Sequence, residues 1–120
     1  MYEIIFYEDA HGNCPVDNLI SQLDKKAERS KDAKIQLKQI MFQLDLLTKA
    51  GTRNSNEYVK HIQGDLWELR PGDNRILLFG WKGNNIVLLH SFRKATNKTP
   101  IREIKRAERE ISDWINRNGL

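Results

Sequence analysis

The chain has 120 residues, of which 39% are hydrophobic and 30% charged, and its formal net charge is +4. This length suits one domain with its own core, so we expect a single domain over residues 1–120. No apolar stretch approaches the roughly 18 residues that cross a bilayer, and we expect neither a membrane span nor a signal peptide. The single cysteine, Cys14, cannot form an internal disulfide and predicts a cytoplasmic location.

The positive charge is concentrated in the second half of the chain. Residues 1–52 carry seven Lys or Arg against eight Asp or Glu, whereas residues 53–120 carry thirteen against eight. A basic half predicts an anionic partner, either nucleic acid or an acidic protein. A solvated, slightly basic surface without such a partner explains the same numbers equally well, because the excess is small.

The first half of the sequence predicts a strand followed by two helices. Strand-forming residues fill positions 2–7. Pro15 suits the first turn of a helix, whose apolar residues follow at helical spacing as far as Leu23. Ser30 is the expected N-cap of a second helix, which Gly51 ends. Together these helices predict a helical hairpin lying on a sheet.

The second half predicts four strands and a last helix. The strands are expected at about 57–62, 66–70, 75–81 and 85–93, after a loop over 52–56. The turns between the last three contain the Gly, Asn and Asp residues that such turns require. Thr99 is the expected N-cap of the final helix and Pro100 its first residue. The expected buried face of that helix contains Ile101, Ile104, Ala107, Ile111, Trp114 and Ile115.

The order of these elements, β-α-α-β-β-β-β-α, predicts an α+β fold. The hairpins imply a mainly antiparallel sheet of four to five strands, covered by the N-terminal helical hairpin and the C-terminal helix. We expect the helices on one face of the sheet, which would leave the other face open, concave or partly polar.

Two arginines flank the turn after the third expected strand. A tight turn would let Arg70 and Arg75 converge, and paired guanidinium groups match the oxygens of a phosphate. Such a pair could bind an RNA backbone and stabilise a pentacovalent phosphate as its charge increases. The alternative is a surface ion pair with Glu68 or Asp73, which would contribute little to stability.

A histidine in the last strand is a candidate for proton transfer. Simple alternation places His90 on the same face as Leu88 and Phe92. An imidazole there could act as general acid or base near neutral pH, and a partly buried histidine bonded to the backbone is the structural alternative. Lys60 and His61 point to opposite faces of their strand, so at most one of them can serve the same site.

A basic run precedes the last helix. Arg93, Lys94 and Lys98 could bind phosphates there, where free helix amides also favour an anion, or they could simply be a solvated strand end. Trp81, next to a turn, could stack on an RNA base, whereas the other aromatic residues are more typical of a core. No Gly-rich phosphate loop, metal-type Cys/His spacing or nucleophile elbow is present, so we expect no cofactor and no metal.

Several stretches of the second half together resemble the RelE/ParE superfamily and, within it, the HigB branch of type II toxins. They are residues 66–70, 74–79, 86–94 and 98–100 and the helix that contains Ala107. The resemblance implies a RelE-like fold over almost the whole chain. It also implies a metal-independent endoribonuclease that cleaves mRNA, usually on the ribosome. A HigA-like helix-turn-helix antitoxin would neutralise it, and operator DNA would be bound only through that antitoxin.

The resemblance also implies roles for basic residues. Arg75 matches the arginine that opens the strand after the hairpin turn, and it is the expected phosphate-stabilising residue. Arg70 matches the arginine that closes the preceding strand. Arg93 or Lys94 falls where relatives place a basic residue at the end of the last strand. In the implied reaction the ribose 2′-hydroxyl attacks the adjacent phosphate and a 5′-hydroxyl leaves.

The resemblance does not identify the group that transfers the proton. His90 and Lys60 are candidates on chemical grounds alone. A ParE-like inhibitor of DNA gyrase without nuclease activity is the alternative from another functional class. A third possibility is an inactive remnant whose basic face binds only the antitoxin. The clustering of a histidine with arginines and lysines favours the nuclease.

Overall fold

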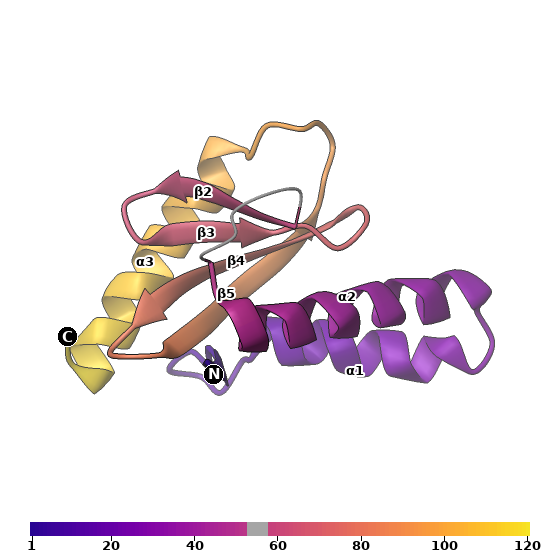
Figure 1. The fold of residues 1–120 in the computed structure, drawn as a ribbon, viewed down its shortest axis with the longest axis horizontal. Coiled ribbons are helices and arrows are strands. Elements are labelled where there is room, and N and C mark those ends of the chain that lie inside the picture. Colours follow the sequence, from indigo (N-terminus) through magenta and orange to yellow (C-terminus); the bar gives the residue numbers. More distant parts are fainter. Residues whose placement is uncertain (53–57) are drawn as a thin grey trace.

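The computed structural model describes residues 1–52 and 58–120, and that part of the chain forms three helices and a five-stranded sheet (Figure 1). The elements are β1 (Glu3–Phe6), α1 (Pro15–Ala27), α2 (Lys31–Ala50), β2 (Val59–Gln63), β3 (Leu66–Leu69), β4 (Asn74–Trp81), β5 (Asn85–Arg93) and α3 (Ile101–Asn118). This order confirms the predicted α+β fold. Within the described ranges, no helix combines the length and the apolar composition that crossing a membrane would require.

The sheet has the strand order β1-β5-β4-β3-β2. The last four strands pair antiparallel with their neighbours, and β1 pairs parallel with β5. The sheet is therefore mainly antiparallel, as predicted. The first position of the strand expected at 57–62, and most of the loop expected at 52–56, lie outside the described residues.

Helices cover both faces of the sheet, which corrects our expectation that they would share one face. The helices α1 and α2 pack on a core that includes Ile76 and Leu78. On the opposite face α3 packs on a second core that includes Leu77 and Phe79, and it lies behind the sheet in Figure 1. Successive residues of β4 enter different cores because side chains alternate along a strand.

The two ends of α2 follow the signals in its sequence. Ser30 Oγ accepts a hydrogen bond of 3.1 Å from the Ala33 amide, which satisfies one of the free donors of the first turn. Gly51 follows the last residue with a φ of 60°. A side chain at that position would also collide with the ring of Tyr2, so only glycine fits. Both predicted ends are confirmed.

The start of α3 differs from the prediction by one residue. Pro100, rather than Thr99, is the N-cap, and Ile101 is the first helical residue. The Thr99 hydroxyl donates instead to Glu68 Oε2 at 2.7 Å. Ile101 was expected to be buried but is exposed, whereas Glu110 of the same helix is buried. Polar contacts with the sheet, as well as apolar packing, therefore determine how α3 sits.

A β-bulge in β5 changes the direction of His90. Leu77 lies opposite His90, but the next residue, Leu78, lies opposite Leu88, so that Leu89 is an extra residue in β5. Leu88 consequently packs in the core under α1 and α2, whereas His90 contacts α3. Our expectation that Leu88 and His90 share a face was wrong because it assumed unbroken alternation.

Candidate functional site

The guanidinium groups of Arg70 and Arg75 approach each other, and they do so around a carboxylate. Arg70 Nε lies 3.0 Å from Glu68 Oε1, and Arg75 Nε lies 3.9 Å from the same oxygen. The other oxygen of Glu68 accepts the hydrogen bond from Thr99. Glu68 is only 1% exposed, so two guanidinium groups neutralise a buried charge. The predicted alternative of an ion pair with Glu68 named the right partner but placed it on the surface.

Arg75 is held inside this cluster. Its Nη1 donates to the carbonyl oxygens of Gly72 at 2.8 Å and Asn74 at 2.9 Å, and the residue is 6% exposed. Burial, together with the nearby charge of Arg70, lowers the pKa of Arg75 below its ordinary value. These contacts show that Arg75 holds the β3–β4 turn through its hydrogen bonds and neutralises the Glu68 carboxylate through its charge.

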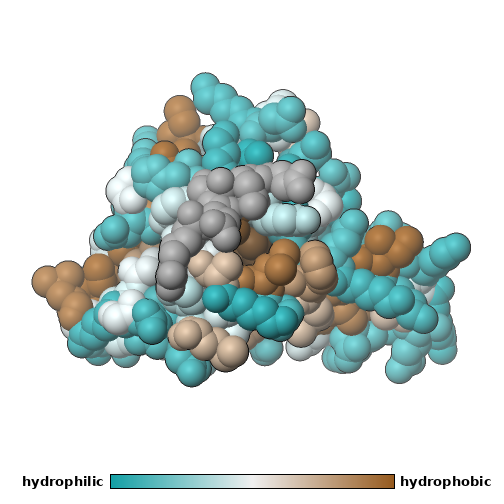
Figure 2. Space-filling view, in the orientation of Figure 1, coloured by the Kyte–Doolittle hydropathy of each residue, from teal (hydrophilic) through white to brown (hydrophobic). Residues whose placement is uncertain are grey.

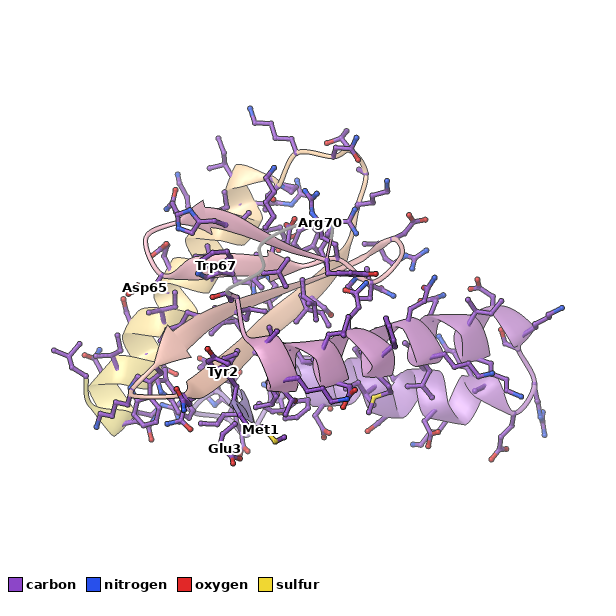
Figure 3. All side chains as sticks on the ribbon, in the orientation of Figure 1. Met1, Tyr2, Glu3, Asp65, Trp67 and Arg70 are labelled. Atoms are coloured by element: carbon purple, nitrogen blue, oxygen red, sulfur yellow. The ribbon has the colours of Figure 1, made fainter. Side chains whose placement is uncertain are left out.

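Arg70 is the more accessible of the two arginines. Its side chain is 22% exposed, and its Nη2 donates to the Asn97 carbonyl at 3.3 Å. The side chain of Asn97 also contacts Lys94, with Nζ 3.5 Å from Oδ1. Figure 3 shows Arg70 at the end of β3, beneath the loop that leads to α3. Lys98 is exposed in that loop, next to Asn97.

Lys60 belongs to the same region of the sheet. It is exposed on β2 and lies directly opposite Glu68 of β3. Directly opposed residues of antiparallel strands share a face, with Cβ atoms about 5 Å apart. Lys60 therefore lies on the α3 side of the sheet, near Arg70. We call the four cations Lys60, Arg70, Lys94 and Lys98 the basic surface.

His90 is completely buried between two carboxylates of α3. Its Nδ1 lies 2.5 Å from Glu110 Oε1 and its Nε2 lies 3.0 Å from Glu103 Oε1. Both contacts can be hydrogen bonds only if both ring nitrogens carry a proton or one carboxyl group does. Arg106 Nε lies 3.3 Å from the second oxygen of Glu110. In this arrangement the imidazole attaches α3 to the sheet and has no exposed atom that a substrate could reach.

Two of the predicted RNA-binding residues, Arg93 and Trp81, are not members of the basic surface. Arg93 Nη1 donates to Gln36 Oε1 at 3.1 Å, so this arginine is on the α2 side of the sheet. Trp81 ends β4, at the opposite end of that strand from the turn, and its Nε1 donates to the Gly119 carbonyl at 2.8 Å. Arg93 nevertheless borders the basic surface, because Arg93 Nη2 and Lys94 Nζ approach the two oxygens of Asp73 at 3.8 Å and 3.9 Å. The structure does not bring Trp81 to the other cations, and the contact of both residues with RNA stays a prediction.

Sequence reasoning did not identify the roles of three glutamates. Glu103 and Glu110 are seven residues apart and therefore share the face of α3 that contains Ala107. Acidic residues on an otherwise apolar helix face were the available signal for a buried polar contact. Glu68 carried a similar signal, because it lies two residues after Leu66 and therefore shares a face of β3 with that apolar side chain.

Comparison with models of protein families gives one match that covers most of the chain. Residues 20–112 match the family model described as phage derived protein Gp49-like (DUF891). The match extends from α1 into α3. The chain belongs to this family. A search of curated proteins found no match.

The Gp49-like family is related to RelE-type toxins, so membership indicates a toxin of a toxin–antitoxin system and, in general, an antitoxin partner. The HigB branch, mRNA cleavage, ribosome binding and a HigA-like antitoxin stay predictions for this Gp49-like protein. Within residues 1–52 and 58–120, no group of three or more His, Cys, Asp or Glu side chains is arranged to hold a metal ion.

Proposed function

We propose that this Gp49-like protein is a toxin that binds and cleaves mRNA at the basic surface. The observation that carries the proposal is the gathering of Lys60, Arg70, Lys94 and Lys98 at one end of the sheet. These cations come from three separate segments of the chain: β2, the end of β3 and the loop before α3. Phosphates of a single RNA strand are the ligands that such an exposed group of cations suits best.

The buried carboxylate beneath the surface prepares Arg70 for phosphate binding. Arg70 Nε donates to Glu68 and Arg70 Nη2 donates to the Asn97 carbonyl, so the guanidinium group of Arg70 is fixed before a substrate arrives. Donors that are already oriented stabilise a developing charge without a cost of reorganisation. Arg75 holds Glu68 and the turn, and we assign it a positioning role instead of the direct phosphate contact expected from the sequence.

The cleavage chemistry requires stabilisation of charge and transfer of a proton. When a ribose 2′-hydroxyl attacks the adjacent phosphate, negative charge on the phosphate oxygens increases, and the guanidinium group of Arg70 stabilises it. The 2′-hydroxyl gives its proton to solvent water as its oxygen bonds to phosphorus, and the bond between phosphorus and the 5′-oxygen breaks. The 5′-oxygen takes a proton from the ammonium group of Lys60, so the products are a 2′,3′-cyclic phosphate and a 5′-hydroxyl. His90 takes no part in these steps, because it is enclosed by α3.

Expression of variants in bacterial cells tests the proposal. Arg70→Ala and Lys60→Ala should abolish growth arrest and the transcript cleavage that primer extension detects. Lys25→Ala, which removes an exposed cation from α1, should leave both unchanged. Lys60 is exposed, so its replacement tests the surface without disturbing the buried cluster. Circular dichroism of each purified variant confirms that it has folded.

Two results would contradict the proposal. If cells that express folded Lys60→Ala or Arg70→Ala still contained cut transcripts, the basic surface would not be required for cleavage. A DNA damage response with intact mRNA in cells expressing the unmodified chain would instead indicate inhibition of DNA gyrase, the alternative function.

A further inference from the structure

The helix α2 carries apolar residues on the side that faces away from the core. Ile35 is 47% exposed and Phe42 57% exposed, and Leu46 is partly exposed. These residues are separated by seven and four positions, so they lie within about 40° of one another around the helix. The core residues of α2, among them Ile40 and Leu44, lie on the opposite side. We call Ile35, Phe42 and Leu46 the outer ridge.

One flank of the outer ridge is basic. Lys31, Lys34 and Lys38 follow one another along that flank, and all three are exposed. Among the described parts of the chain, none of these lysines forms an ion pair. The opposite flank carries the amide side chains of Gln36, Gln39 and Gln43 and one carboxylate, Asp32, which accepts a hydrogen bond of 2.6 Å from Gln36 Nε2. The ridge is thus bordered by three lysines on one side and by amides with a single carboxylate on the other.

The surface around the outer ridge is not flat. A hollow of about 260 Å³ lies between α2 and the β3–β4 turn, and its lining includes Ile35, Gly72, Arg93 and the carboxylates of Asp32 and Asp73. Figure 2 shows hydrophobic patches over α2 on this face, separated by hydrophilic atoms. An elongated partner could therefore lie along α2 with side chains entering the hollow beside it.

We infer that the outer ridge docks an amphipathic helix of a partner protein that carries acidic residues beside its own apolar stripe. The spacing of seven and four residues is that of a coiled-coil seam, into which a second helix packs its apolar residues. Carboxylates next to that stripe would meet Lys31, Lys34 and Lys38, since Asp45, the carboxylate on the same flank of α2, already pairs with Lys49 at 2.9 Å.

A second copy of this chain fits the ridge less well than an acidic helix. If two copies paired through antiparallel α2 helices, the two lysine flanks would face each other. If the helices ran parallel, each lysine flank would face amides. The parallel arrangement supplies Asp32 as the single carboxylate for three lysines, and the antiparallel one places like charges together.

The outer ridge and the basic surface lie on different sides of the sheet. The ridge is on the layer formed by α1 and α2, whereas the basic surface is on the α3 side. Docking at the ridge therefore does not depend on the proposed RNA cleavage. The antitoxin that family membership implies in general is a partner for which an acidic helix could be sought.

Peptide binding tests this inference. The probe is a synthetic three-heptad helix with Leu at the a and d positions and Glu at e and g, and the control peptide has Lys in place of Glu. Fluorescence anisotropy should show that the chain binds the Glu peptide and prefers it to the Lys peptide. Phe42→Ser and the double variant Lys34→Glu, Lys38→Glu should each weaken binding by about tenfold. Ile101→Ser, an exposed apolar change on α3, should bind as the unmodified chain does.

Three outcomes would overturn the inference. The first is that the Glu peptide fails to bind the unmodified chain. The second is that it binds Phe42→Ser as tightly as it binds the unmodified chain. The third is that the Lys peptide binds the unmodified chain as tightly as the Glu peptide does. Sedimentation adds a separate check: dimerisation of the chain that Phe42→Ser abolishes would assign the ridge to a second copy and would also overturn it. The changed side chains are exposed, so the variants should fold, and thermal denaturation verifies this.

Discussion

On the α3 side of the sheet, the buried Glu68 accepts hydrogen bonds from Arg70 and the Thr99 hydroxyl and forms an ion pair with Arg75. Removing a carboxylate and its partners from water costs several kcal/mol per ion, and only good contacts compensate for that cost. Such a cluster contributes little net stability compared with apolar side chains, but it is expensive to break. Its value lies in holding Arg70 at a defined position on the surface.

The first prediction concerns this buried charge. Glu68→Gln should lower the free energy of unfolding by about 3–5 kcal/mol, because Arg70 and Arg75 would then lie together without a counter-charge. Urea denaturation at neutral pH measures the change. Asp45→Asn breaks the exposed pair with Lys49 and should have a far smaller effect. Equal losses in the two variants would show that Glu68 is not the centre of the cluster.

A second prediction at this scale concerns Tyr7, whose hydroxyl donates to Asp113 Oδ2 at 2.7 Å. Burial, then this hydrogen bond and the charge of Asp113, raises the pKa of Tyr7 from 10.0 to about 12. The folded state therefore holds the phenolic proton more tightly than the unfolded state does. The resulting stabilisation should be complete below pH 10 and should disappear as the pH rises towards about 12.

The Tyr7→Phe variant isolates that pH dependence. The difference in unfolding free energy between the unmodified chain and Tyr7→Phe should shrink across this alkaline interval. Absorbance titration of the tyrosines should also lose its most alkaline component in the variant. A difference in stability that stays constant across the interval would contradict the assigned contact.

Among the elements, α3 is attached to the sheet in two ways. An apolar stripe that includes Ala107, Ile104 and Ile111 packs on the second core. His90 of β5 adds a polar attachment, because its two ring nitrogens contact two carboxylates that lie about two turns apart on the same helix face. The bulge in β5 makes this possible by directing the imidazole towards α3.

The third prediction tests this attachment. His90→Leu should destabilise the protein by about 3–5 kcal/mol, because Glu103 and Glu110 would face an apolar side chain without a cation or donor. Replacing both glutamates by Gln in the same variant should recover part of the loss. Hydrogen exchange of the α3 amides and urea denaturation measure the two effects. His11→Ala, which changes an exposed loop residue, is the control.

A different finding for His90 would be informative. If His90→Leu unfolded at the same urea concentration as the unmodified chain while transcript cleavage disappeared, the imidazole would act in the reaction and not in the attachment of α3. The buried position of His90 predicts the opposite pattern, in which His90→Leu lowers the stability of the protein.

Across the whole molecule, a sheet between two helical layers separates two surfaces of positive character. The α3 side presents the basic surface, and the opposite layer presents the outer ridge with its lysine flank. Since each surface is built from different elements, RNA binding and partner docking can be changed separately by substitution.

The fourth prediction follows from the number of cations on the basic surface. If its four members each contact a phosphate, the logarithm of the association constant for single-stranded RNA should fall against the logarithm of salt concentration with a slope of about −3. Lys98→Ala should reduce the magnitude of that slope by about 0.7, whereas Lys25→Ala should not change it. Fluorescence anisotropy with a labelled oligonucleotide measures both. An unaltered slope in Lys98→Ala would mean that Lys98 contacts no phosphate.

Signals that act over a few residues were predictable from the sequence. Ser30 and Gly51 end α2 as expected, because a cap and a positive φ depend only on the adjacent turn. The approach of Arg70 to Arg75 was also predictable, since a short turn brings the ends of its two strands together. Thr99 was misassigned because its hydroxyl serves a strand rather than the helix it precedes.

The order of the elements, the helix ends and the turns are therefore properties of the sequence by itself, since each depends on the chemistry of neighbouring residues. Only the tertiary structure decided which face α3 covers, where the bulge redirects His90, and that Glu68 collects both arginines. These features join residues far apart in the chain, such as His90 with Glu110 and Thr99 with Glu68. Their contacts depend on how the layers pack, which no local pattern of residues encodes.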